Sequence, residues 1–128
     1  MRKGLEEQQQ IEEVVTRFAG DYMSARPESV LVDLHDSHVL VTLRQVVCPA
    51  EREYARERSS RERLERLFSE TFDTVKAELE TAVARIVGGT VRQSRLSVDA
   101  LTGDAVVVFF MEQPTSPRPE NQSNGYGE

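Results

Sequence analysis

Hydrophobic residues recur with two different periods along the chain, and the changes of period mark the expected elements. Between residues 5 and 25 the apolar positions are spaced by three and four, which places them on one stripe of an α-helix. Pro27 ends this helix, because the residue before a proline avoids helical backbone angles. The period then changes to two over residues 29–34 and 38–44, and the short polar break between them predicts a β-hairpin.

The second half of the chain repeats this succession. Pro49 suits the first turn of a helix, since the amide hydrogen that proline lacks has no partner there. A longer apolar stripe over residues 60–87 predicts a helix of about 40 Å, and the glycines at 88–89 can end it by adopting left-handed angles. Residues 91–99 and 104–112 then predict a second β-hairpin.

The order helix–strand–strand therefore occurs twice, and it predicts the α+β class. We expect a two-layer αββαββ domain, with amphipathic helices packed on a four-stranded, mainly antiparallel sheet. Residues 1–112 are expected to form this single domain, and the Pro-, Gly-, Ser- and Asn-rich residues 113–128 to form a disordered tail. A weak likeness between residues 29–41 and 96–108 suggests a structural duplication.

Two of the predicted strands are apolar on both sides. Strands 38–44 and 105–111 show this pattern, which is expected only when both faces of a sheet are covered. The residues predicted to lie on the second face are Leu31, Leu40, Val107, Phe109 and Met111. Either residues 49–66 fold over this face or another subunit covers it, and we favour a homodimer with these residues at its interface.

Composition narrows the class of protein. The chain has 128 residues, 16 of them basic and 22 acidic, and its formal charge is −6. The single cysteine, Cys48, excludes an intrachain disulfide. No apolar run approaches the roughly 20 residues that cross a bilayer, and the first residues lack the apolar core of a signal peptide. A cytoplasmic protein without direct membrane insertion is expected.

Few side chains offer catalytic or metal-binding chemistry. His35 and His38, with Asp33 and Asp36, could form a metal cluster, but no third nitrogen or sulfur ligand is evident, and a solvated turn is favoured. Cys48 would need a base and an orienting group to act as a nucleophile. Phosphate-loop, zinc-helix and serine-elbow motifs do not occur. The sequence thus predicts no catalytic residue, metal or cofactor.

Residues 51–66 form the most highly charged segment. Six arginines and five glutamates leave a net charge of only +1, and pairs such as Glu57–Arg61 and Glu62–Arg66 stand four residues apart. A solvated, self-paired helix face is therefore expected. RNA-binding sheets present exposed aromatic residues in a basic field, which this acidic chain lacks, so no nucleic-acid partner is expected.

Three arginines on the predicted strands suggest an alternative function. Arg44, Arg92 and Arg95 could line a pocket between the long helix and the sheet, or a dimer seam, and bind bicarbonate or phosphate there. The alternative hypothesis is therefore a small-anion-binding regulatory domain. An enzyme would additionally require a cleft with paired titratable groups of shifted pKa.

Several segments together resemble one protein family. They are Val30–Asp36 leading into Val39–Leu43, Cys48–Glu51, Glu78–Val83 leading into Gly88–Gly89, and Ser97–Asp99 followed by Val106–Phe109. In order and spacing they resemble the MpsC-like family, formerly a domain of unknown function, over about residues 8–112. The chain departs from the family pattern at Ser24–Pro27, where a glycine-rich link is usual, and at Gly88–Gly89, where glycine is usually followed by a basic residue.

The resemblance implies a role beside a membrane system. The family name refers to a sodium-translocating, membrane-potential-generating system whose membrane subunits are linked to bicarbonate or inorganic-carbon uptake, and a small member would be an accessory to it. Membrane transporter subunits are then the implied partners. The leading hypothesis is a noncatalytic cytoplasmic accessory or regulatory module, homodimeric, that is associated with a membrane ion or inorganic-carbon transport system.

Overall fold

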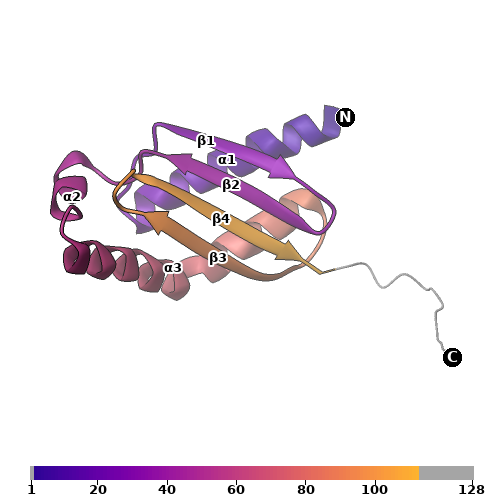
Figure 1. Cartoon of the computed structure of the whole chain (residues 1–128). Coiled ribbons are helices and arrows are strands. Elements are labelled where there is room, and N and C mark those ends of the chain that lie inside the picture. Colours follow the sequence, from indigo (N-terminus) through magenta and orange to yellow (C-terminus); the bar gives the residue numbers. More distant parts are fainter. Residues whose placement is uncertain (1, 113–128) are drawn as a thin grey trace, which may run out of the picture.

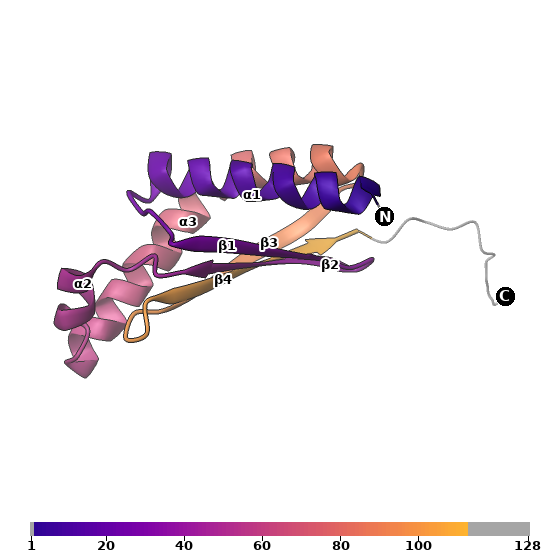
Figure 2. The same ribbon diagram turned by 90° about the horizontal axis from the view of Figure 1, so that it is seen from above.

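Two long helices lie against one face of a four-stranded sheet in the computed structural model, which describes residues 2–112. The elements are α1 (Arg2–Tyr22), β1 (Ser29–Leu34), β2 (His38–Arg44), α2 (Pro49–Tyr54), α3 (Arg58–Val87), β3 (Val91–Asp99) and β4 (Asp104–Met111). Figure 1 shows α1 and most of α3 behind the sheet, and Figure 2 shows α1 and the later part of α3 on one side of it. The predicted α+β class and αββαββ order are confirmed, whereas the expected tail, 113–128, lies outside the described residues.

The sheet is antiparallel throughout, with the strand order β1-β2-β4-β3. The second strand of each αββ unit therefore lies in the middle of the sheet, and the first strand of each lies at an edge. This order relates the two units by an approximate twofold axis normal to the sheet. It also makes β2 and β4 neighbours, although about 60 residues separate them in the sequence.

The core lies between the sheet and the helices. Its buried side chains from the helices include Ile11, Val15 and Phe18 of α1 and Phe72, Leu79 and Val83 of α3. Phe18 and Phe72 join the two helices edge to face, with ring centroids 6.1 Å apart. Burial of these stripes explains why the sequence shows period 3.6 in both helices.

Three residues predicted to lie on the second sheet face instead contact the helical layer. They are Val107, Phe109 and Met111, and each is at most 8% exposed. Strand β4 is apolar on both sides, so its alternation defines two faces without showing which one the helices cover. The residues of β4 that lie on the second face are Val106, Val108 and Phe110. The prediction that Val107, Phe109 and Met111 lie on the second face was therefore wrong: the alternation along β4 was assigned to the opposite faces of the sheet.

The charged segment 49–66 lies at one end of the sheet. Figures 1 and 2 show α2 and the start of α3 beyond the ends of the strands. There Glu65 Oε2 accepts a hydrogen bond of 2.9 Å from the amide of Ala100. This segment therefore does not cover the second sheet face, and the first of the two alternatives considered for that face is excluded.

The charged helix face is solvated and self-paired, but with other partners than expected. Arg58 Nε lies 3.6 Å from Glu62 Oε2, and both side chains are exposed. Arg61 instead donates a hydrogen bond of 3.1 Å to the carbonyl oxygen of Ala55, at the end of α2. Exposed pairs of this kind contribute little to stability, so the segment owes its place to packing and backbone contacts.

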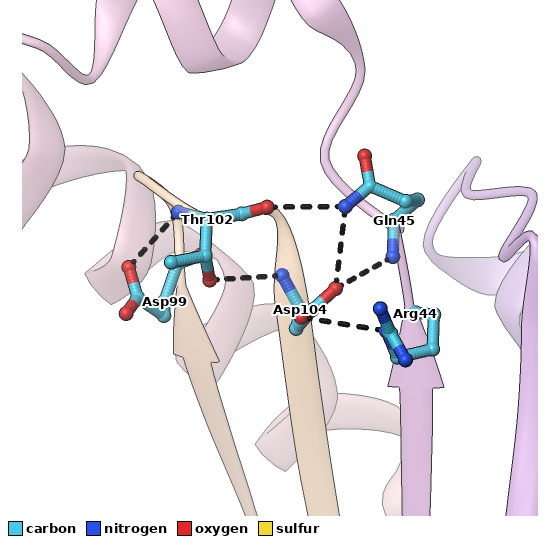
Figure 3. A network of polar contacts seen from close by, with 5 residues as sticks. All are labelled: Arg44, Gln45, Asp99, Thr102 and Asp104. Carbon is cyan, nitrogen blue, oxygen red and sulfur yellow. Dashed lines mark hydrogen bonds and ion pairs between the residues drawn. The ribbon is translucent and has the colours of Figure 1, made fainter.

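The turn between β3 and β4 is fastened to the end of β2 (Figure 3). The Asp99 carboxylate accepts a hydrogen bond from the Thr102 amide at 3.2 Å. Asp104 Oδ1 accepts one from the Gln45 amide at 3.0 Å, and its Oδ2 lies 3.5 Å from Arg44 Nε. These two aspartates therefore fix the turn and its position, as turn chemistry predicts.

The two sheet edges are both obstructed. At the β1 edge, the Gln8 side chain of α1 donates a hydrogen bond of 3.0 Å to the carbonyl oxygen of Val32. At the other edge, the pairing of β3 with β4 is irregular between Val91 and Gln93. A bulge and an occupied carbonyl both interrupt the row of free backbone groups that an edge strand presents.

A hydrogen bond between side chains links the two long helices at the surface. The helix α1 ends at Tyr22 rather than near residue 25, because Ser24 takes a left-handed backbone with φ 53°. The Tyr22 hydroxyl then donates to a carboxylate oxygen of Glu78 on α3. This hydrogen bond, together with the negative charge of Glu78, raises the pKa of the Tyr22 phenol above its ordinary value.

The raised pKa predicts a loss of stability at alkaline pH. The folded state holds the phenol proton more tightly, so this contribution is complete below the unfolded pKa of about 10 and is lost as the pH rises through the folded value. In Tyr22→Phe, we expect stability to decline less steeply above that pH. In an absorbance titration, the tyrosinate step that occurs at the highest pH should also disappear. Tyr54→Phe is the control, and loss of that step in this variant instead would contradict the assignment.

Candidate functional site

The face of the sheet opposite α1 and α3 is the main candidate site, and we call it the open face. It carries five apolar side chains: Leu31, Leu40, Val106, Val108 and Phe110. In Figure 1 this face is turned to the viewer, and no element of the described chain lies in front of it. A contiguous apolar area of this kind on a protein surface usually marks a contact with another molecule.

Packing within the sheet hides only part of this apolar area. Leu31, on edge strand β1, is 55% exposed. Leu40 and Val108 face each other across the central strands and are half-buried by their neighbours alone. Burial of such apolar area by a partner is favourable at roughly 25 cal/mol per Å². The open face can therefore bind another apolar surface.

The strand register arranges the open face in rows that cross the sheet. In the order β1, β2, β4, β3 the rows are Ser29–Arg44–Asp104–Asp99, Leu31–Thr42–Val106–Ser97 and Asp33–Leu40–Val108–Arg95, followed by the shorter row His38–Phe110–Gln93. The apolar side chains lie mainly in the middle of these rows. Polar and charged side chains lie at their ends, as they do at the rim of a protein interface.

The third row carries opposite charges at its two ends. Asp33 lies on β1 and Arg95 on β3, three strand spacings and therefore about 14 Å apart. Within the described residues, neither side chain forms an ion pair. The β3 edge also carries Arg92, which lies over the Phe110 ring at 5.8 Å. At this end of the open face the β1 edge is thus acidic and the β3 edge basic, whereas Asp99 lies at the other end of β3.

The structure does not bring together the three arginines expected to bind an anion. Arg44 lies at one end of the open face, paired with Asp104. Arg92 lies near Phe110, which pairs with His38 at the far end of β2, about 20 Å away along the strand. Arg95 lies between these two ends, on the edge strand. No single small anion could contact all three.

The space between α3 and the sheet also offers no anion site. The cavity there has a volume of about 40 Å³ and is lined by apolar side chains, among them Phe18, Phe72 and Leu96. A site of that size holds at most a few water molecules, and a charged ligand would lose its hydration there without gaining a partner. The pocket proposed for an anion at this place is therefore not supported.

A larger pocket, of about 560 Å³, lies between the α1–β1 and β2–α2 connections. Its lining includes charged residues of both signs, such as Arg26, Glu28 and Glu51. Ser24 and Gln45, which also line it, are the described non-glycine residues with positive φ. The pocket brings part of Ser24–Pro27, where the chain departs from the family pattern, beside Cys48–Glu51, which carries the resemblance, but the charges there do not converge on a ligand of one sign.

The remaining candidate residues occupy local structural roles. The His35 and His38 rings stack at 4.5 Å in the β1–β2 turn, and no group of three or more potential metal ligands occurs among residues 2–112. Cys48 is exposed, and its amide donates a hydrogen bond of 3.1 Å to Glu51 Oε1 at the start of α2. None of the described helices is both long enough and apolar enough to cross a membrane.

Comparison with known proteins gives one match. The model of a family described as "Na+-translocating membrane potential-generating system (MpsC)" matches residues 3–113, which include all the described strands. No curated protein and no solved structure matches the chain. The family match therefore covers the whole sheet and both long helices.

Proposed function

We propose a function from the premise that this chain belongs to the MpsC family, described as a Na+-translocating membrane potential-generating system. We infer that the chain is a noncatalytic cytoplasmic accessory or regulatory module of such a system. Its partners would be the membrane subunits that carry the ion or inorganic carbon. The module would act as a homodimer, because a second copy is the partner that best suits the open face.

The open face is the observation that carries this proposal. It is apolar in the middle and polar at its ends, and no described element covers it. A site for chemistry would require titratable groups converging in a cleft. The apolar residues that converge here favour binding of a protein instead.

A dimer formed through the open face would leave the helical layer of each copy free for the membrane subunits. That layer also carries exposed apolar side chains. Leu67 of α3 is 59% exposed, and Tyr22 of α1 is also exposed. Two different contacts, one with a second copy and one with a membrane subunit, could then form at the same time.

The proposed role can be tested by measuring the membrane potential. Inverted membrane vesicles from host cells that lack this chain should build a smaller Na+-dependent potential, reported by a voltage-sensitive dye. Addition of the purified chain, or expression of it in those cells, should restore the potential. An equal Na+-dependent potential with and without the chain would refute an accessory role in this system.

A further inference from the structure

We propose that two copies of this chain pack open face to open face about a twofold axis parallel to the strands, which places Asp33 of each copy against Arg95 of the other. This inference rests on the proposed self-association and specifies its geometry. The observation that supports this geometry is the order of charged residues across the rows of the sheet.

A twofold axis along the strands has a simple effect on the rows. Rotation about this axis leaves each row at the same position along the strands but reverses the order of its residues across the sheet. Strand β1 of one copy therefore faces β3 of the other, and β2 faces β4. Each row faces the same row of the second copy, read in the opposite order. Two sheets packed in this way run nearly parallel, as is common for sheets stacked about 10 Å apart.

The third row is complementary to its own reverse. Asp33 of one copy faces Arg95 of the other at both edges, and Leu40 faces Val108 at both central positions. Each dimer thus contains two copies of this ion pair flanking an apolar centre. A twofold interface requires such self-complementarity, because the same residues must serve on both sides.

The other rows fit the same axis. In the first row Arg44 faces Asp104 of the second copy, so the ion pair within each copy is extended across the interface. In the second row Thr42 faces Val106, and in the last His38 faces Phe110. No two like charges oppose each other in any of the four rows.

The other twofold axis available to two stacked sheets fits less well. An axis across the strands would keep each strand opposite itself and exchange the rows. Asp33 would then face Leu31, and Asp104 would face Phe110 of the second copy. Each carboxylate would lose water without gaining a cation, which is costly in an interface. The charge order therefore selects the axis along the strands.

The size of the open face indicates a reversible dimer. Four strands about 4.8 Å apart and roughly 20 Å long give a flat footprint of about 400 Å² per copy. Stable interfaces bury about 800 Å² of accessible surface per partner, about twice this footprint, so the contact belongs with the weak, transient interfaces. Its dissociation should be measurable across an ordinary range of protein concentrations.

Charge reversal tests the geometry. In Asp33→Arg each edge of the dimer would bring two cations together, and in Arg95→Asp two carboxylates. Like charges placed opposite each other across an interface repel, so we expect each variant to raise the dissociation constant at least about tenfold. An equimolar mixture of the two variants should form a heterodimer in which both edges are again complementary, and the double variant should recover the homodimer.

Sedimentation velocity over a concentration series would measure all five samples: the unaltered chain, both single variants, their mixture and the double variant. Circular dichroism checks the fold, which should persist because both positions lie at sheet edges. If the single variants dimerise as well as the unaltered chain, or if their mixture stays monomeric, the proposed axis is wrong while the dimer itself stands. If the unaltered chain is monomeric throughout, the proposed self-association fails as well.

Discussion

Phe109→Ala is expected to lower the free energy of unfolding by about 3–5 kcal/mol. Phe109 is completely buried between the central strand β4 and the helices, and Val39 and Ser94 flank it on the neighbouring strands. Alanine would leave a cavity there, because the surrounding strands are held by their ladders and can collapse only in part. Urea unfolding followed by circular dichroism gives the difference.

The adjacent position supplies a matched control. Phe110 lies on the open face of the same strand and is only half-buried. Phe110→Ala should cost about 1 kcal/mol in a dilute sample that is monomeric, while weakening the dimer in a concentrated one. Similar losses of monomer stability in the two variants would show that the two faces of β4 are assigned incorrectly.

Val108→Lys is expected to prevent self-association. Val108 lies at the centre of the open face, and in the proposed dimer it faces Leu40 of the second copy. An ammonium group buried there without an anion costs about 3–5 kcal/mol, and Arg95 beside it adds repulsion. The dissociation constant should rise at least about a hundredfold. The monomer should stay folded, because the lysine can reach solvent when no partner is present.

Leu67→Lys is the control for this change. It introduces the same charge at an exposed leucine of α3, outside the open face. Light scattering coupled to size-exclusion chromatography should show Leu67→Lys as dimeric as the unaltered chain and Val108→Lys as monomeric. Loss of the dimer in Leu67→Lys, with retention in Val108→Lys, would move the interface to the helical layer.

The elements and their ends could be predicted largely from the sequence because their signals are local. The hairpin strands 29–34 and 38–44 occur as expected, since alternation and a polar break are read from a few neighbouring residues. The end of α3 at Val87 follows from Gly88, which adopts φ 74°. The end of α1 was less predictable, because a serine rather than a glycine takes the left-handed position.

The faces of β4 were harder to assign, although the sequence holds a signal that settles them. Strand β3 has a polar side that includes Arg95 and Ser97. Once Asp99 and Asp104 flank a four-residue turn, hairpin register places Val108 opposite Arg95 and Val106 opposite Ser97. The polar side of β3 and the outward side of β4 must then coincide. Alternation within β4 alone carries no such information.

The candidate site could not be derived from the sequence alone, because it depends on contacts between distant segments. The rows of charges exist only in the strand order β1-β2-β4-β3, in which Leu40 meets Val108. Chain-local patterns do not specify which hairpin strands become neighbours. For the same reason the position of residues 49–66 at the end of the sheet remained open until the fold was known.

The obstructed sheet edges limit how large the assembly can become. Further copies could extend a sheet only by adding strands at its margins, where the Gln8 contact blocks one side and the β3 irregularity the other. The proposed face-to-face contact would be occupied by a single second copy. We therefore expect this protein to stop at two copies and to resist growth into filaments, even at the high local concentrations that recruitment to a membrane would create.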